Sequence, residues 1–258
     1  LRGVIFHDPT LGNAEDGMGW VTADEYLSGN VRQKLRQAEA AAAENPAYQV
    51  NVEALLAAQP KDLDASEIEV RLGATWIDRS YIKQFMFETF DTPSYLRYSM
   101  DVQYSPYTAA WSISNKTRIS YNDVAAWNTY GTDCVSAYEI LEDSLNLRDV
   151  QVFDTIEDAD GKKKRVLNAK ETTLAAQKQQ LIRDAFRDWI WADPQRRQAL
   201  VRQYNEEMNS TRPREYDGSH IVFAGMNPEI SLREHQRNAI AHVLYGGNTL
   251  LAHEVGAG

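Results

Sequence analysis

The most constraining feature of the sequence is a long amphipathic stretch over residues 169–192, whose period is that of one helix. Asn168 and Glu171 form a capping pattern at its start, and Pro194 follows its end because proline cannot continue a helix. Residues 195–209 repeat the helical period, so we expect two helices joined as a hairpin. The apolar stripe of the first helix is Leu174, Leu181, Ile182, Ala185, Phe186, Trp189 and Ile190.

Further upstream the period changes from that of a helix to that of a strand. Residues 96–104 alternate apolar and polar side chains, which is typical of a half-buried strand. Trp111 and Ile113 continue this alternation in a second strand, and Ile119 and Tyr121 mark a third. Short strands that follow one another in this way predict a small antiparallel sheet.

A second strand pair is expected over residues 150–156 and 162–167, joined by a polar turn. Thr22 and Glu25 form a capping box at the start of another helix. The shorter helices that we expect cover residues 23–44 (with a break near Gly29), 50–58, 65–72, 79–90 and 133–145. The fold class is therefore α+β, mostly helical, with small antiparallel sheets.

Composition narrows the class of protein. The 258 residues carry a net charge of −10 and are 43% hydrophobic, as in an ordinary globular protein. No apolar run approaches ~20 residues and no secretory signal is visible, so we expect no membrane span and a cytoplasmic location. The one cysteine, Cys134, excludes an internal disulfide framework, and we expect it to be a small buried residue.

The last eight residues, 251–258, combine an apolar lead with a glycine-rich turn at Gly256-Ala257-Gly258. A phosphate-binding loop has such a turn after a buried strand, followed by Lys and Ser or Thr. Here the position for that Lys lies beyond the last residue. We therefore expect the chain to be a piece of a longer protein that ends just inside an ATP site.

The residues before this turn strengthen that expectation. Leu-Arg-x-x-Gln at 232–236 opens a helical run over 237–245, Gly246-Gly247 ends it, and Glu-Val-Gly-Ala-Gly follows an apolar stretch. This order resembles the start of the first motor domain of superfamily-two helicases, in particular Swi/Snf-type DNA translocases. Residues 212–220, 225–228, 24–32 and 72–77 are also similar to very large helicase-related proteins of bacterial plasmids, phages and conjugative elements, often fused to a DNA adenine methylase.

The resemblance implies an ATP-dependent DNA helicase or translocase as the parent protein, with ATP and Mg²⁺ as its cofactors. It implies that Gln236 reads adenine and that the truncated Walker A loop holds the phosphates through Glu254, Val255, Gly256, Ala257 and Gly258. The expected division is a helical N-terminal region (1–92), an α+β accessory domain with the helical hairpin (93–211), and a connector with the start of the ATPase lobe (212–258). Residues 1–258 lack the loop's lysine and the acidic motif, so we expect no ATPase activity and no bound nucleotide.

Two other classes of function stay open. The first is a non-catalytic DNA-binding or scaffolding domain that links a methylase region to the motor. Its residues would be the basic cluster Lys162, Lys163, Lys164 and Arg165, although such a run is more often a solvated hairpin edge. The second is an intrinsic enzyme, which is disfavoured because the methylase motif is absent: Asn227-Pro228 is followed by Glu229. The five histidines show no zinc-type spacing, and no metal site is expected.

Overall fold

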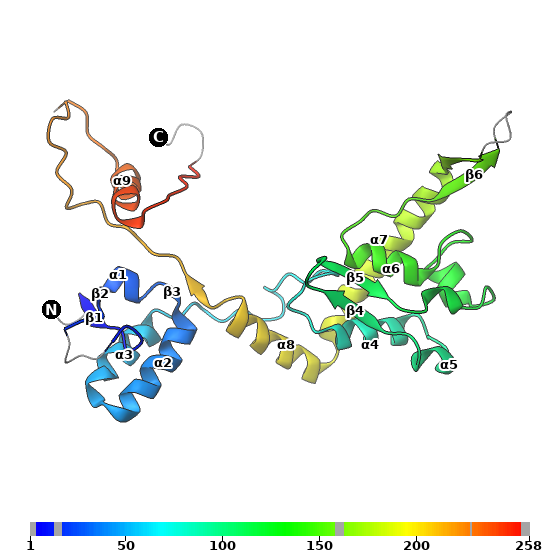
Figure 1. Ribbon diagram of the computed structural model, residues 1–258, viewed down its shortest axis with the longest axis horizontal. Coiled ribbons are helices and arrows are strands. Elements are labelled where there is room, and N and C mark those ends of the chain that lie inside the picture. Colours follow the sequence, from blue (N-terminus) through cyan, green and yellow to red (C-terminus); the bar gives the residue numbers. More distant parts are fainter. Residues whose placement is uncertain (1–3, 13–16, 158–162, 228, 254–258) are drawn as a thin grey trace. The chain divides into compact units, whose positions relative to one another are not determined.

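The structure is a computed structural model that describes residues 4–12, 17–157, 163–227 and 229–253 (Figure 1). The chain forms two compact units: unit 1 comprises Leu1–Asp62 and Asn205–Gly258, and unit 2 comprises Leu63–Tyr204. Helices predominate in both units, and every sheet among the described residues is two-stranded and antiparallel, so the predicted α+β class is confirmed. The expected division at residues 92 and 211 stays a prediction.

Unit 1 is built on helices and short strands. Its small core contains Phe6, Tyr26 and Val31, with Tyr26 stacked on Phe6 at a ring separation of 5.1 Å. The expected helix over 23–44 is broken as predicted near Gly29, whose φ of +72° favours glycine. The elements are β1 (Ile5–His7), β2 (Trp20–Thr22), α1 (Ala23–Tyr26), β3 (Gly29–Asn30), α2 (Val31–Glu44), a 3₁₀ helix (Pro46–Tyr48), α3 (Gln49–Ala57), β8 (Thr211–Arg212) and α9 (Glu234–Gly246). β1 pairs with β2, and β3 pairs with β8.

Unit 2 packs its helices around an aromatic core. Phe85 contacts both Phe186 and Trp189, with ring centroids 5.1 and 5.6 Å apart. These contacts fix α4 against α7. The elements are α4 (Arg79–Thr89), α5 (Ser94–Arg97), β4 (Val102–Ser105), β5 (Ala110–Ile113), a 3₁₀ helix (Lys116–Arg118), a π-helix (Ala125–Thr129), α6 (Ala137–Leu145), β6 (Phe153–Glu157), β7 (Lys163–Leu167), α7 (Ala169–Ala192) and α8 (Pro194–Glu207), which continues into unit 1.

The best-predicted element is α7, which begins and ends as the sequence indicated. The Glu171 N–H donates to Asn168 Oδ1 at 3.0 Å, which satisfies one of the first free N–H groups of the helix. Figure 1 shows the β6–β7 hairpin beside the N-terminal end of α7. The helix therefore carries the hairpin at its start, while its later turns pack in the core of unit 2.

Several local predictions were wrong. Residues 96–104 do not begin as a strand, because Leu96 is buried from within the short helix α5 and extended pairing starts only at Val102. The third strand is absent from the described residues, because Asn115 adopts φ +56° and turns the chain into a 3₁₀ helix. Thr22 makes no side-chain cap on α1.

Two further expectations also fail. Residues 65–72 form turns and an extended stretch rather than a helix, since Ile68, Val70 and Leu72 are buried while the side chains between them are exposed. A period of two is a strand pattern, which a helix cannot satisfy. Cys134 is exposed rather than buried. Among the described residues, no helix has both the length and the apolar character needed to cross a lipid bilayer.

Candidate functional site

The expected adenine reader, Gln236, lies in the first turn of α9 and is half-buried. Its side-chain Oε1 accepts a hydrogen bond of 2.9 Å from the backbone N–H of Arg233. This bond satisfies a backbone donor at the start of the helix. The glutamine therefore holds the turn through which the chain enters α9.

The segment before α9 folds back against it. Tyr216 stacks on His242 with ring centroids 4.3 Å apart and an interplanar angle of 17°. The Gly218 N–H donates to Asn238 Oδ1 at 2.9 Å, and a Cβ atom at Gly218 would lie 2.1 Å from the carbonyl oxygen of Arg237. Only glycine fits so close an approach, so residues 216–218 and α9 pack as one piece.

Arg214 ties this segment to α1 within unit 1. Its Nε donates to Asp24 Oδ2 at 2.7 Å, and its guanidinium lies 5.0 Å from the centre of the Tyr216 ring. Burial alone would raise the pKa of Asp24, but hydrogen bonds from Thr22 and Arg214 outweigh burial and lower that pKa. Asp24 therefore stays charged and keeps the arginine in place.

The expected phosphate-binding loop cannot be compared with the structure. Glu254, Val255, Gly256, Ala257 and Gly258 lie outside the described residues. The apolar stretch before them, Thr249 to Ala252, forms no strand, and Leu250 is 86% exposed. A buried strand needs neighbouring strands to pair with, and the described residues supply none here.

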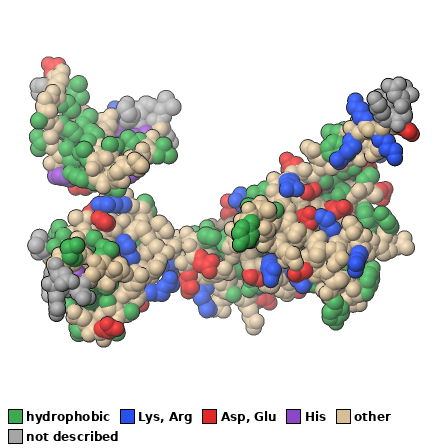
Figure 2. Space-filling view, in the orientation of Figure 1, with side chains coloured by type: hydrophobic (Ala, Val, Ile, Leu, Met, Phe, Trp, Pro, Cys, Tyr) green, Lys and Arg blue, Asp and Glu red, His purple; other side chains and the backbone are tan. Residues whose placement is uncertain are grey.

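The basic cluster lies on the β6–β7 hairpin, whose described residues are all exposed. Lys163, Lys164 and Arg165 stand opposite Glu157, Ile156 and Thr155, while Lys162 lies outside the described residues. The Arg165 guanidinium sits 4.5 Å from the ring centre of Phe153. Figure 2 shows Lys and Arg side chains gathered at this end of the unit. The hairpin thus offers both cations and an aromatic surface to a partner.

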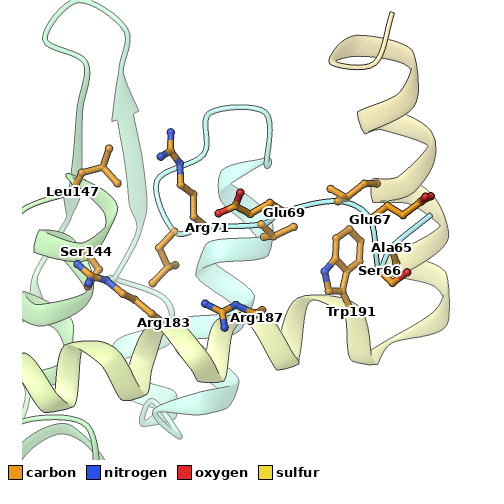
Figure 3. A pocket seen from close by; sticks show the side chains of 13 residues that line it. Ala65, Ser66, Glu67, Glu69, Arg71, Ser144, Leu147, Arg183, Arg187 and Trp191 are labelled. Carbon is orange, nitrogen blue, oxygen red and sulfur yellow. The ribbon is translucent and has the colours of Figure 1, made fainter. Parts of the chain in front are cut away.

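A groove in unit 2, which the sequence did not reveal, runs between residues 65–72 and one face of α7 (Figure 3). Its volume is about 680 Å³, within the range of small-ligand sites. Figure 3 shows Arg183, Arg187 and Trp191 following one another along α7 on the side that faces the groove. Arg71 lines the groove from the extended segment.

The groove carries more positive than negative charge on its α7 wall. Arg183 pairs with Asp149 at 3.9 Å, and Arg187 pairs with Asp184 at 3.5 Å. Both distances are long for ion pairs and the carboxylates are 93% and 49% exposed, so these pairs contribute little. The arginines can therefore exchange these partners for an anion. No group of three or more His, Cys, Asp or Glu among the described residues is placed to hold a metal ion.

A protein-family model matches most of unit 2. The model of the domain of unknown function DUF8437 matches residues 71–210, more than half of the 258 residues. The chain belongs to the DUF8437 family. No curated protein matches the chain, and no solved structure does.

The DUF8437 region contains the hairpin and the α7 wall of the groove, and Arg71 is its first residue. It does not contain α9 or Gln236. One sequence signal could have indicated the groove: Arg183, Arg187 and Trp191 recur at intervals of four and so share one face of a helix.

Proposed function

We propose that the chain is the accessory segment and the beginning of the ATPase core of a DNA helicase or translocase of the Swi/Snf type. In this proposal the parent protein is cytoplasmic, belongs to a bacterial mobile element, and also carries a DNA methylase region. Residues 1–258 do not hydrolyse ATP by themselves. DNA and the methylase region are the partners of the intact protein.

The observation that carries the proposal is the form of α9. The helix spans Glu234–Gly246, places Gln236 in its first turn, and is followed by Gly247 with a φ of +76°. This is the order of glutamine, helix and glycine break on which the resemblance to these motors rests. The packing of Tyr216 on His242 gives the helix a neighbour from the segment that precedes it.

ATP and Mg²⁺ would supply the chemistry of phosphoryl transfer in the intact protein. A glutamine amide has two donor hydrogens and an acceptor oxygen with two lone pairs. Gln236 can therefore hold the Arg233 N–H and still present both kinds of group to an adenine edge. The loop residues Glu254 to Gly258 would place backbone N–H groups around the phosphates.

The test uses the complete polypeptide that the gene encodes, assayed for ATP and GTP hydrolysis with and without DNA. We expect DNA-stimulated hydrolysis that prefers ATP. Gln236→Ala should raise KM for ATP roughly ten-fold, as expected for lost hydrogen bonds to the base, and should weaken the preference over GTP. Gln198→Ala, at an exposed site on α8, is the control and should change neither. Absence of DNA-stimulated turnover, or an unaltered Gln236→Ala enzyme, would contradict the proposal.

A second candidate function is non-catalytic: a DNA-binding or scaffolding domain between methylase and motor. The exposure of the hairpin on both faces favours it, because two exposed strands are marginally stable alone and gain from a partner. A two-stranded ribbon also fits the major groove of duplex DNA. Replacing Lys163, Lys164 and Arg165 by Gln should then reduce the salt dependence of duplex binding by about 0.9 per lost phosphate contact. Unchanged binding would leave the cluster as a solvated edge.

A further inference from the structure

We propose that the groove between residues 65–72 and α7 binds a single strand of DNA. Arg183 and Arg187 contact neighbouring phosphates, and Trp191 stacks on a base. This inference rests on the proposed function only for the choice of DNA as the nucleic acid. The groove itself is argued from its own geometry.

Arg183, Arg187 and Trp191 are evenly spaced along α7. Residues four apart on a helix are separated by about 6 Å along its axis. Arg183, Arg187 and Trp191 therefore form a row with two equal steps, which Figure 3 shows along the wall of the groove. Neighbouring phosphates of an extended strand repeat on a similar scale. A positively charged wall combined with an aromatic platform is the arrangement by which proteins hold single strands.

The two guanidinium groups on α7 are held only weakly by their present carboxylate partners. Arg183 and Arg187 have side chains that are 37% and 63% exposed, and their carboxylate partners lie at 3.9 and 3.5 Å. A phosphate could replace these long contacts with two parallel hydrogen bonds to each planar guanidinium. Arg71 also lines the groove, from the opposite wall, and Figure 3 shows its guanidinium directed away from α7. The site therefore gains more from a phosphate than it loses from its present ion pairs.

The size and the charge of the groove exclude a DNA duplex and an acidic peptide as its ligand. A cavity of about 680 Å³ takes a few nucleotides of one strand and cannot enclose a duplex. An acidic peptide would be repelled by Glu67 and Glu69, which line the wall opposite α7. Carboxylates on that side instead suit bases, because they accept hydrogen bonds from exocyclic amino groups. The two walls thus match the two sides of a strand: phosphates along α7 and bases toward residues 67–69.

The experiment measures binding of a fluorescent oligo(dC), whose bases carry an exocyclic amino group, to residues 1–258 without nucleotide, at several salt concentrations. We expect log K to fall with log salt at a slope of about −1.4, for the two phosphates of a single strand that Arg183 and Arg187 contact. The double variant Arg183→Gln with Arg187→Gln should lower the slope by about 1.4. Trp191→Leu should weaken binding roughly ten-fold and leave the slope unchanged.

A matched control is Arg79→Gln with Arg202→Gln, which removes two exposed cations from α4 and α8 in the same unit and should bind as the wild type does. Circular dichroism confirms that each variant is folded, and Arg187→Lys provides a milder second variant. The inference is overturned if oligo(dC) does not bind at low salt, if duplex or a poly-glutamate peptide binds more tightly, or if the hairpin variant abolishes strand binding while the groove variants do not. Equal binding of oligo(C) RNA would overturn the choice of DNA. Because no nucleotide is present, failure here is separate from failure of the ATPase test.

Discussion

Arg196 makes the contacts that close the C-terminal end of α7, the helix that forms one wall of the groove. Its Nε donates to the carbonyl oxygen of Ile190 at 3.0 Å, and a terminal nitrogen donates to that of Trp189. The guanidinium carbon lies 3.5 Å from the ring centre of Trp189, and only 8% of the residue is exposed. The last carbonyl groups of a helix lack partners inside the helix, and a cation there is favourable. We predict that replacing Arg196 destabilises unit 2.

The size of the effect follows from these contacts. Each hydrogen bond from a charged group contributes about 1.5 to 3 kcal/mol, and the stack on Trp189 adds about 1 kcal/mol. In Arg196→Ala water can reach part of the vacated space and satisfy one of the carbonyl groups. The expected loss is therefore about 3 kcal/mol, a large part of the roughly 5 to 15 kcal/mol that keeps a domain folded.

The assay is urea unfolding followed by the fluorescence of the six tryptophans, among them Trp189 beneath the guanidinium. Arg196→Lys keeps the charge but loses the planar fork, so its loss should be about half as large. Arg202→Ala, at an exposed position on α8, should stay within about 0.5 kcal/mol of the wild type. If Arg196→Ala unfolds within about 1 kcal/mol of the wild type, the contacts at the end of α7 do not hold the unit together as argued.

Three other perturbations follow from single contacts. Burial raises the pKa of Tyr138 to about 12, so the unfolded chain loses this proton first and Tyr138 should contribute a fall in stability of about 3 kcal/mol between pH 10 and 12. Tyr138→Phe should make the fall between melts at pH 9 and 12 smaller by about this amount, while Tyr26, whose pKa burial also raises, keeps its own share. Gly73→Ala should cost about 3 kcal/mol in the same urea assay, because its Cβ would lie 2.2 Å from the Leu145 carbonyl oxygen at a φ of +86°; a normal transition would refute this. Lys83 Nζ lies 3.0 Å from Asp101 Oδ1, and its hydrogen bond lowers the pKa of that carboxyl. Asp101→Asn should therefore lower the free energy of unfolding by less than about 1 kcal/mol at pH 7 and not at all at pH 2. A loss that persists in acid would exclude the ion pair as its cause.

The elements that the sequence predicted well are those that local chemistry decides. Asn168 caps the start of α7 and the helix ends before Pro194, so both limits are set by residues that adjoin the helix in the sequence. The helix over 79–89 is likewise fixed by Asp78, whose carboxylate accepts from the Ser80 N–H at 2.8 Å. Such signals need no knowledge of tertiary packing.

The groove could not be predicted in this way. Arg71 and Arg183 are brought to one cavity by packing between segments more than a hundred residues apart in the chain. The sequence of residues 65–72 predicts a helix, because acidic residues at the start of the segment are typical of a helix N-terminus. The alternating burial of Ile68 and Val70 instead requires an extended chain. Tertiary burial overrode the local preference at this segment.

The net charge of −10 repels DNA, but screening by salt limits the distance over which this repulsion acts. At physiological salt, exposed charges separated by more than about 8 Å are largely screened. The potential that a bound strand experiences is therefore set by the residues that line the groove, which are Arg183 and Arg187 on α7 and Glu67, Glu69 and Arg71 on the opposite wall. The remaining acidic surface should act mainly at low salt, where screening is weak, and should flatten the dependence of affinity on salt there. We therefore predict that strand binding weakens least steeply below about 0.05 M salt and approaches the full slope near 0.15 M, whereas a site held by the hairpin cations alone would show one constant slope.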